Sequence, residues 1–314
     1  MGEKISTRVA YGNALGEFGE NPLMVALDAD LASCTMSEVF AQKYPDRFFN
    51  VGIAEANMID MAAGFATTGK IAFCHSFAMF TAGRGYDQIR NSVAYPHLNV
   101  KIIGSHAGLT VGEDGATHQC IEDLSLMRTV PGMVVLAPCD AHETREAVKA
   151  IIDYEGPCFM RTGRIAVDTV TDAIPGYSFT LGKGVTLRDG GDLTIVATGL
   201  MVQKALGAAD LLEKEGIHPR VIDIHTIKPL DKDLILKAAA ETGVLVTAEE
   251  HSVVGGLGSA VCELVCAEYP VPVIRVGVND EFGRSGPAEE LLTRYGLSSE
   301  HLVETAKKAV SRKK

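Results

Sequence analysis

The segment FFNVGIAEANMIDMAAGFAT, residues 48–67, decides the fold, because it joins a short apolar run to a helix-forming run through a tight connection. Asn50-Val51-Gly52 can end a strand or form a turn, and Glu55 then opens a pattern with helical spacing. The helix carries apolar residues almost all round, which predicts that it is buried. A strand followed at once by a buried helix is the repeating unit of an α/β layer.

Glu55 is the one carboxylate at the start of this predicted buried helix. An acidic residue there interacts favourably with the helix dipole, by about 0.3–1 kcal/mol, and this structural explanation stays open. Burying an unpaired carboxylate, however, costs several kcal/mol or favours its protonated form. The second explanation is therefore a carboxyl group that shares or donates a proton, and Glu55 is a candidate catalytic residue.

Strands and helices are predicted to alternate along the first half of the chain. Nearly continuous apolar runs give the strand candidates 23–30, 71–77, 100–106, 133–138 and 157–162. Continuous runs indicate parallel strands that are covered by helices on both faces. Helical spacing at 54–67 and 141–153 completes the pattern of a doubly wound α/β layer.

A second alternating set follows a break in the pattern. Residues 164–192 contain Pro175 and five glycines, with little helical spacing. After them come predicted strands at 193–199, 220–226, 244–250 and 271–277, with helices near 201–215, 231–241, 256–269 and 287–312. The sequence thus predicts an α/β protein with two doubly wound domains, residues 1–165 and 191–314, joined by a linker at 166–190.

Composition limits the classes of function. With 314 residues the chain can form two cores, and its net charge of -11 argues against general binding to nucleic acid or an anionic membrane. It has no apolar signal core and no run of about 18 apolar residues. Seven cysteines without a C-x-x-C pair, mostly inside apolar runs, predict reduced, buried thiols in a cytoplasmic protein.

Two further stretches carry candidate site residues. HSFAMFTAGRGYDQIR, residues 75–90, places Phe77, Phe80 and Tyr86 around a glycine-containing turn after a predicted strand. These aromatic residues either fill a core or stack on a flat heterocycle. SHAGLTVGEDGATHQ, residues 105–119, gathers two histidines and two acidic residues in a glycine-rich loop: His106, Glu113, Asp114 and His118.

Loops after strand ends are the usual ligand sites of α/β sheets. The 105–119 loop has neither H-x-x-x-H nor H-E-x-x-H spacing, so acid/base work and hydroxyl recognition are favoured over metal binding. Arg8 and Arg161 are candidates for binding an anion, although an arginine on the surface is the simpler explanation.

Taken together, an ordered set of motifs resembles the C-terminal half of transketolase from about residue 5 to the end of the chain. The motifs are STRVAYGNAL, DADLASCT, PDRFFNVGIAEAN, SFAMF, DQIR, GEDGATHQCIEDL, MVVLAPCD and CFMRTGR, followed by IKPLD (227–231) and TAEEHSVVGGLGSAV (247–261). The resemblance implies a pyrimidine-binding thiamine-diphosphate domain followed by a transketolase C-terminal domain.

The resemblance also implies a cofactor and its contacts. In that family thiamine diphosphate lies between two α/β domains that bind its opposite ends. Glu55 falls on the glutamate that hydrogen-bonds the aminopyrimidine ring, where its proton favours the imino tautomer that activates the thiazolium carbon. Phe77 and Phe80 fall on the positions that stack on the ring.

The same resemblance places substrate contacts. His106, Asp114, His118 and Arg161 fall on contacts to sugar hydroxyls and phosphate, and Arg8 falls on another phosphate contact. His106 and His118 would also move protons while a two-carbon ketol unit passes from a ketose phosphate to an aldose. Xylulose 5-phosphate is the family default, but Cys34 stands where the family often has serine. A thiol is a poorer hydrogen-bond donor, so the sugar pair stays open.

One family motif is missing. The diphosphate-binding domain of transketolases holds Mg²⁺ or Ca²⁺ through G-D-G, and G-D-G does not occur in this sequence. The resemblance therefore implies a separate N-terminal-type transketolase subunit that binds the diphosphate and the metal, in an α2β2 assembly. No metal site is expected in this chain itself.

Three other assignments are compatible with parts of the sequence. Deoxyxylulose-phosphate synthase shares VGIAE and THQ, but usually has arginine at the position of His106 and G-A-D-G at residues 112–115. The β subunit of 2-oxoacid dehydrogenases also lacks the diphosphate domain, but GEDGATHQ fits it less well. A non-catalytic homologue kept for binding or regulation would be expected to have lost the glutamate, and Glu55 is present.

Overall fold

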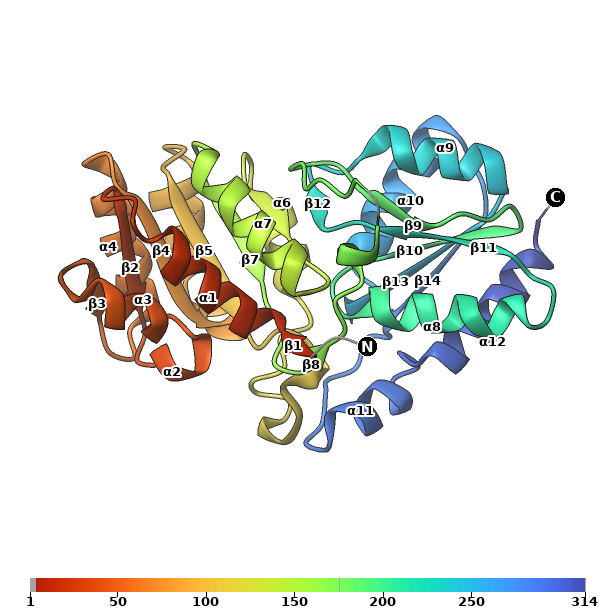
Figure 1. Cartoon of the computed structure of the whole chain (residues 1–314), viewed down its shortest axis with the longest axis horizontal. Helices are drawn as coiled ribbons and strands as arrows, with labels where there is room; N and C mark the ends of the chain where they lie inside the picture. The colour runs from red at the N-terminus through yellow and green to blue at the C-terminus, as the bar shows by residue number, and fades with distance from the viewer. Residues whose placement is uncertain (1–3, 175, 314) are drawn as a thin grey trace.

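The computed structural model describes residues 4–174 and 176–313, which form two α/β units side by side (Figure 1). The first unit runs from red to yellow-green in Figure 1, and the second runs from green to blue. The predicted class, α/β with two parallel-sheet units, is confirmed. The two larger sheets lie in different units, but one strand from the second half of the chain joins the first sheet.

The first sheet has the strand order β12-β6-β7-β5-β4-β2-β3. Its members are β2 (Met24–Asp28), β3 (Phe48–Asn50), β4 (Ile71–Phe77), β5 (Val100–Ser105), β6 (Val134–Leu136), β7 (Cys158–Arg161) and β12 (Thr226–Lys228). All neighbours pair in parallel except β12, which pairs antiparallel with β6. Every residue of β2, β4, β5, β6 and β7 is buried, as continuous apolar runs predict.

Helices cover this sheet. They are α1 (Thr7–Phe18), α2 (Ala32–Thr35), α3 (Glu38–Lys43), α4 (Glu55–Thr67), α5 (Tyr86–Gln88), α6 (Asp123–Thr129) and α7 (Ala141–Asp153), with a short 3₁₀ turn η1 (Pro45–Arg47). The predicted helix 54–67 is confirmed as α4, but its burial all round is not. Met58 and Ile59 are buried, whereas Asn57 and Asp60 are exposed, because this chain packs against only one face of the helix.

The predicted turn after β4 is helical instead. Residues 79–94 form two π-helical segments, η2 (Met79–Arg84) and η3 (Ile89–Ala94), separated by α5. A Cβ atom on Gly85 would lie 2.8 Å from the backbone oxygen of Thr81, so glycine permits the close packing of this widened turn. Glycine is usually a sign that a helix ends, but in this stretch it lies within a helical segment.

The second sheet has the order β14-β13-β10-β11-β9, with β9 antiparallel and the others parallel. The strands are β9 (Val185–Arg188), β10 (Leu193–Ala197), β11 (Pro219–Asp223), β13 (Leu245–Ser252) and β14 (Val273–Val278). The helices are α8 (Met201–Glu213), α9 (Lys232–Thr242), α10 (Leu257–Glu268), α11 (Ala288–Arg294) and α12 (Ser299–Val310). These elements confirm the second alternating set, with the tail divided into two helices.

The predicted linker at 166–190 is tied to both units. β8 (Ala166–Val167) pairs antiparallel with β1 (Ile5–Ser6) beside the start of α1, and β9 joins the second sheet. Between them lies the 3₁₀ turn η5 (Thr171–Ala173). Pro175 lies outside the described residues, and the domain limits at 165 and 190 stay a prediction.

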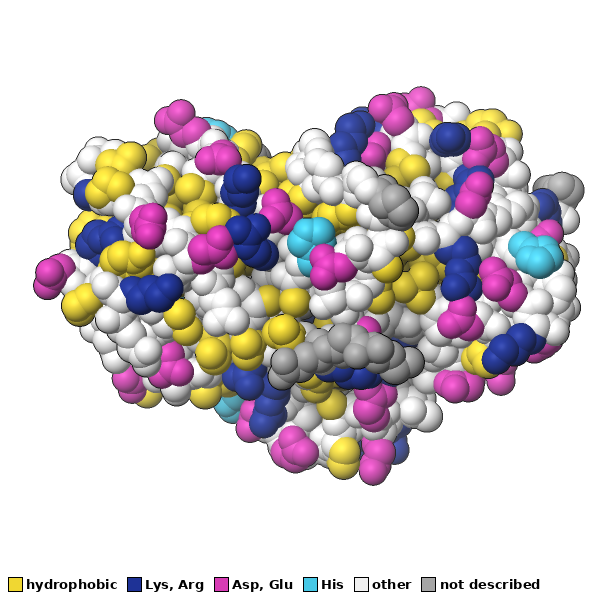
Figure 2. All heavy atoms as spheres, in the orientation of Figure 1, with side chains coloured by type: hydrophobic (Ala, Val, Ile, Leu, Met, Phe, Trp, Pro, Cys, Tyr) yellow, Lys and Arg dark blue, Asp and Glu magenta, His cyan; other side chains and the backbone are white. Residues whose placement is uncertain are grey.

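The surface shown in Figure 2 carries basic and acidic side chains mixed over both halves. Across residues 4–174 and 176–313, no helix combines the length and the apolar character needed to cross a membrane. The seven cysteines all lie in the described part of the chain and are free thiols, as predicted. Their predicted burial is confirmed for Cys74, Cys120, Cys139 and Cys158, but Cys34 and Cys262 are half-buried and Cys266 is exposed.

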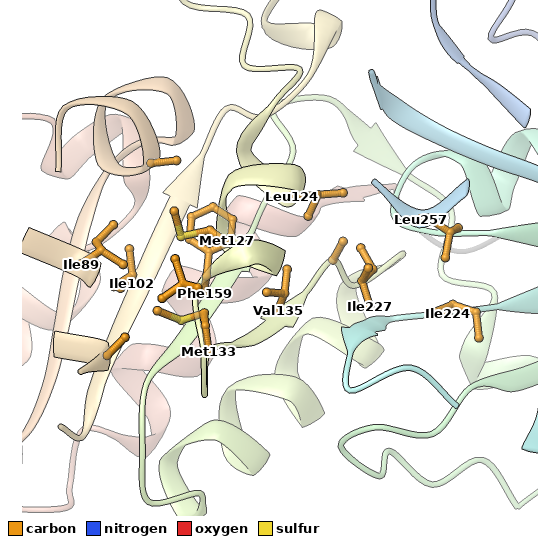
Figure 3. Close-up of a cluster of buried hydrophobic side chains, with 14 of the residues drawn as sticks. Ile89, Ile102, Leu124, Met127, Met133, Val135, Phe159, Ile224, Ile227 and Leu257 are labelled. Carbon is orange, nitrogen blue, oxygen red and sulfur yellow. The ribbon is translucent and has the colours of Figure 1, made fainter. Parts of the chain in front are cut away.

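One hydrophobic cluster extends across both units (Figure 3). In the first unit it contains Phe159 of β7 and Val135 of β6, and it continues through Ile227 of β12 to Ile224 and Leu257 of the second unit. The shared cluster and the antiparallel pairing of β12 with β6 join the two units into a single packed body.

Candidate functional site

The candidate residues gather where neighbouring parallel strands end. Glu55 begins the helix after β3, Phe77 ends β4, His106 follows β5 and Arg161 ends β7. The carboxyl ends of parallel strands meet at one edge of the sheet, which is where ligands bind in open α/β folds. The topology therefore brings together residues that are up to 106 positions apart in the sequence.

Glu55 is buried, with only 3% of its surface exposed. The Ser76 hydroxyl donates a hydrogen bond to its Oε1 at 3.1 Å, and the Arg84 guanidinium lies 3.8 Å from its Oε2. Because the Arg84 side chain is 60% exposed, water weakens this ion pair. The carboxyl group is thus oriented by two neighbours and keeps acceptor capacity for a ligand atom.

Aromatic rings and the two histidines form the centre of the site. The rings of Phe77 and Phe80 are stacked at 16° with their centroids 6.0 Å apart, and the Arg84 guanidinium lies 4.7 Å from the Phe80 centroid. His106 stacks on Phe77 at 4.1 Å, while His118 meets Phe80 edge-on at 5.3 Å. The structure thus brings these four sequence-predicted residues into contact.

His106 is held as a neutral imidazole. Burial, together with the charges of Arg8 and Arg164, lowers the pKa of His106 to about 3. Its Nε2 lies 3.5 Å from Arg8 Nη1, and a guanidinium can only donate, so Nε2 is the acceptor. The proton then resides on Nδ1, which donates to the Ser105 hydroxyl at 2.9 Å.

Arg8 lies at the edge of this group. Its Nη1 donates to the backbone oxygen of Cys34 at 2.9 Å, and its buried Nε has no hydrogen-bond partner among the described residues. Burial is the main cause that lowers the pKa of Arg8, which nevertheless stays cationic at neutral pH. A cationic guanidinium held in place by the Cys34 carbonyl fits a role in binding an anion.

The other two predicted substrate contacts have their partners elsewhere. Arg161 is buried, with its Nε 3.0 Å from Asp123 Oδ2 and its two Nη atoms donating to the backbone oxygen of Glu250 at 3.2 and 3.3 Å. Asp114 is exposed and lies 3.5 Å from Arg164 Nη1. The structure therefore places Arg161 at the boundary between the units and Asp114 on the outer loop.

Sequence reasoning missed Ser76, Arg84, Arg164 and Glu250. Arg84 follows Phe80 by four residues, which is the spacing of neighbours on one helix face. Because a turn is predicted there instead of a helix, the contact between Arg84 and Phe80 is not expected from the sequence. Glu250 ends an apolar strand pattern. An ionisable residue at the end of a predicted buried strand is a signal that could have identified it as a candidate site residue.

A second buried group of ionisable residues lies between the units. Ligand atoms of Cys139, Glu143 and Asp223 lie within 4.8 Å of one another, and the Tyr177 hydroxyl donates to Glu143 Oε1 at 2.7 Å. Burial, reinforced by Glu143, raises the pKa of Asp223 well above its usual value. Burial likewise raises the pKa of the Cys139 thiol, so both groups favour their neutral, protonated forms.

Comparisons with known proteins show which family the two units resemble. The family model described as "Transketolase, pyrimidine binding domain" matches residues 3–169, and the model "Transketolase, C-terminal domain" matches residues 182–302. A solved structure described as a split gene transketolase, inactive β4 tetramer, has a TM-score of 0.92 and 52% identity, and the match covers 99% of this chain and 100% of that chain.

Two relatives show how the chain compares in length. A 6-deoxy-6-sulfo-D-fructose transketolase subunit of Clostridium sp. (strain MSTE9) is 44% identical over 98% of this chain and 95% of its own length. The transketolase of Rattus norvegicus is 39% identical over 99% of this chain, but the match spans 50% of that protein. The chain therefore belongs to the transketolase family and comprises the pyrimidine-binding and C-terminal domains of that family.

Proposed function

We propose that this chain is the C-terminal subunit of a two-subunit, thiamine-diphosphate-dependent transketolase. It would transfer a two-carbon ketol unit from a ketose phosphate to an aldose. The observation that carries the proposal is the buried Glu55 at the same sheet edge as the stacked rings of Phe77 and Phe80. Because the chain belongs to the transketolase family, we interpret this arrangement of Glu55, Phe77 and Phe80 as a binding site for the cofactor's pyrimidine ring.

The residues at the strand edge fit the pyrimidine end of the cofactor. Phe77 and Phe80 offer ring faces for a flat heterocycle, and Glu55 offers a buried oxygen for a ring nitrogen. When bound, thiamine diphosphate supplies the nucleophilic carbon that makes and breaks the carbon–carbon bond. The role of Glu55 is to hold and exchange a proton at its carboxyl group, in an orientation fixed by Ser76 and Arg84.

The two histidines would serve the sugar. His106 is neutral, so it can exchange hydrogen bonds with a hydroxyl without introducing a positive charge beside Arg8. His118 packs against Phe80 and is partly exposed, with its Nδ1 2.9 Å from the Thr117 hydroxyl. We assign both to hydroxyl recognition and proton movement as the substrate reacts.

Arg8 would bind a negatively charged end of the substrate through its guanidinium group, which lies beside His106. Phosphate is the group that the family resemblance implies. The name of the Clostridium relative specifies a sulfonated sugar, and a sulfonate is an anion that a guanidinium can also bind. The donor class proposed here is therefore a ketose with an anionic end, with the phosphate ester as the first choice.

The diphosphate end of the cofactor and its Mg²⁺ or Ca²⁺ would belong to a second polypeptide. The sequence contains no G-D-G motif. The split gene transketolase chain and the Clostridium subunit both match this chain along nearly their whole length, which supports a separate subunit. The proposed assembly pairs this chain with an N-terminal-type transketolase subunit as α2β2.

Calorimetric titration with thiamine diphosphate and Mg²⁺ tests the proposal. The chain would be titrated alone and after mixing with an N-terminal-type subunit that carries G-D-G. We expect tight binding and ketol transfer from xylulose 5-phosphate only in the mixture. Tight binding and turnover by this chain alone would contradict the two-subunit proposal, and a fully bound but inactive mixture would contradict the catalytic one.

A further inference from the structure

The histidine loop, residues 106–122 between β5 and α6, carries three of the predicted site residues but little regular structure of its own. Only the 3₁₀ segment η4 (Leu109–Asp114) interrupts it, and His106 has a positive φ of 56°. Buried backbone groups of such a loop need partners from outside it. Those partners determine how the histidines are presented.

The C-terminal domain supplies several of these partners. Glu250, two residues before the end of β13, accepts a hydrogen bond from the Thr110 backbone N–H to its Oε1 at 2.7 Å. Two more bonds reach the later part of the loop: Ser252 N to Ile121 O at 2.8 Å, and Gln119 Nε2 to Arg284 O at 2.9 Å. The histidine loop is thus fixed from the other domain near its beginning and near its end.

Glu250 makes the charged contact in this set. Its carboxylate lies so close to Gly108 that a Cβ atom at position 108 would collide with it. The backbone oxygen of Glu250 also accepts both hydrogen bonds from the Nη atoms of Arg161. A single residue of the C-terminal domain therefore contacts the start of the histidine loop and the arginine at the end of β7.

We propose that Glu250 is a positioning residue of the active site: its carboxylate fixes the histidine loop at Thr110, and its carbonyl oxygen fixes Arg161. The C-terminal domain would then shape a site whose candidate catalytic residues all belong to the pyrimidine-binding domain. The inference rests on the proposed function only in naming the histidine loop as catalytic. The positioning itself is a property of this chain alone.

Charge makes the contact sensitive to pH. Burial raises the pKa of Glu250 to about 7, while Arg161 and the Thr110 N–H oppose that shift. The charged or titratable groups around it are Arg161 on β7, Asp123 on α6, and Glu249 and His251 on β13 itself. A carboxyl group whose pKa is raised by burial binds its proton more tightly in the closed loop than in the opened one, so the loop should be better protected at pH 6 than at pH 8.

Glu249 provides a matched control. It is the preceding residue of β13, it is buried, and burial raises its pKa to about 7 as well. Its two oxygens, however, accept the N–H groups of Leu257 and Gly258 at 2.7 and 2.8 Å, at the start of α10 in its own domain. Glu249→Gln therefore removes a comparable charge without touching the histidine loop.

Hydrogen–deuterium exchange of the isolated chain, read by mass spectrometry and corrected for intrinsic rates, tests the proposal. Glu250→Ala should speed exchange of peptides covering residues 107–121 by about tenfold, the equivalent of one lost hydrogen bond. Glu250→Gln keeps an oxygen acceptor, so it should retain protection but lose its pH dependence. Glu249→Gln should affect peptides around residues 256–259 and leave the loop as in the wild type.

Unchanged loop exchange in Glu250→Ala, or an equal change in Glu249→Gln, would overturn the proposal. If Glu250→Ala does not fold, the test rests on Glu250→Gln. Loop protection that still varies with pH in Glu250→Gln would also overturn the proposal. Exchange requires neither cofactor nor partner, so this result stands apart from the two-subunit proposal. In a reconstituted enzyme Glu250→Ala should raise KM and lower kcat, and Glu250→Gln should largely restore both at pH 8.

Discussion

Glu55 is a residue whose surroundings are more informative than its position at a helix start. A helix dipole alone would not require the Ser76 hydroxyl or burial to 3% exposure. Both features suit a carboxyl group that exchanges a proton with a bound ring.

Glu55→Gln preserves the shape and the bond with Ser76 but removes the exchangeable proton. We expect turnover of the reconstituted complex to fall by about 10²–10⁴, the usual contribution of a general acid or base. Circular dichroism and Tm should stay near those of the wild type. Glu304→Gln, at an exposed position of α12, is the control, and near-normal turnover of Glu55→Gln would favour the binding or regulatory alternative.

His106 gives a prediction for stability as a function of pH. Its pKa is lowered from 6.5 to about 3 in the folded chain, so the unfolded chain binds the proton first on acidification. The stability that the neutral imidazole contributes is present above pH 6.5 and is lost as pH falls towards 3. Urea unfolding of the wild type and His106→Asn should therefore show the wild type losing stability relative to the variant between these pH values; a constant difference would contradict it.

Asp140 shows how one side chain joins elements that are distant in the sequence. It caps α7 through the Glu143 N–H at 2.8 Å, and its Oδ2 accepts the N–H groups of Val170 and Thr171 at 2.8 Å each. Asp140→Ala should lower the free energy of unfolding by about 2–4 kcal/mol, from one lost cap and two orphaned amides.

The matched control is Ser298→Ala. Ser298 caps α12 through the His301 N–H alone, at 3.3 Å, so this change should cost about 1 kcal/mol. Both values come from urea denaturation of the purified chain. Equal losses for the two variants would mean that the bonds to residues 170 and 171 contribute nothing.

The elements with strong local patterns were predictable. α7 spans 141–153 and β4 spans 71–77, as predicted, because apolar spacing and turn residues at their ends agree. The π-helical stretch at 79–94 was missed because local propensity reads its glycines as a turn. The run 220–226 was predicted as one strand, but the chain leaves the second sheet after Asp223 and enters the first at Thr226, which local pattern cannot reveal.

At the scale of the molecule, the site also contains some residues that the sequence predicts and others that it does not. Glu55, Phe77 and His106 follow strands in recognisable motifs, so their gathering at one edge follows from a parallel sheet. Ser76 and Glu250 were not foreseen, since their roles depend on which side chain meets them across the sheet or across the domain boundary. Such contacts are tertiary, and one sequence contains no direct signal for them.

The shared core predicts that the two domains unfold together. β12 belongs to the first sheet, and Ile227 within it is 1% exposed in a cluster that includes both domains. Differential scanning calorimetry should show one transition whose calorimetric and van't Hoff enthalpies agree. Ile227→Ala should destabilise the whole chain by about 2–5 kcal/mol, and two separated transitions in the wild type would contradict this prediction.

The pairing of β12 with β6 bears on how relatives of this chain can be recombined. A chimera joined near residue 190 takes Thr226–Lys228 from one parent and the strand that receives it from the other. The register and the side-chain packing between β12 and β6 would then not have been selected together. Libraries of chimeras should therefore contain folded proteins mainly when β12 and β6 come from the same parent sequence. This holds even though the junction near residue 190 lies far from both strands in the sequence.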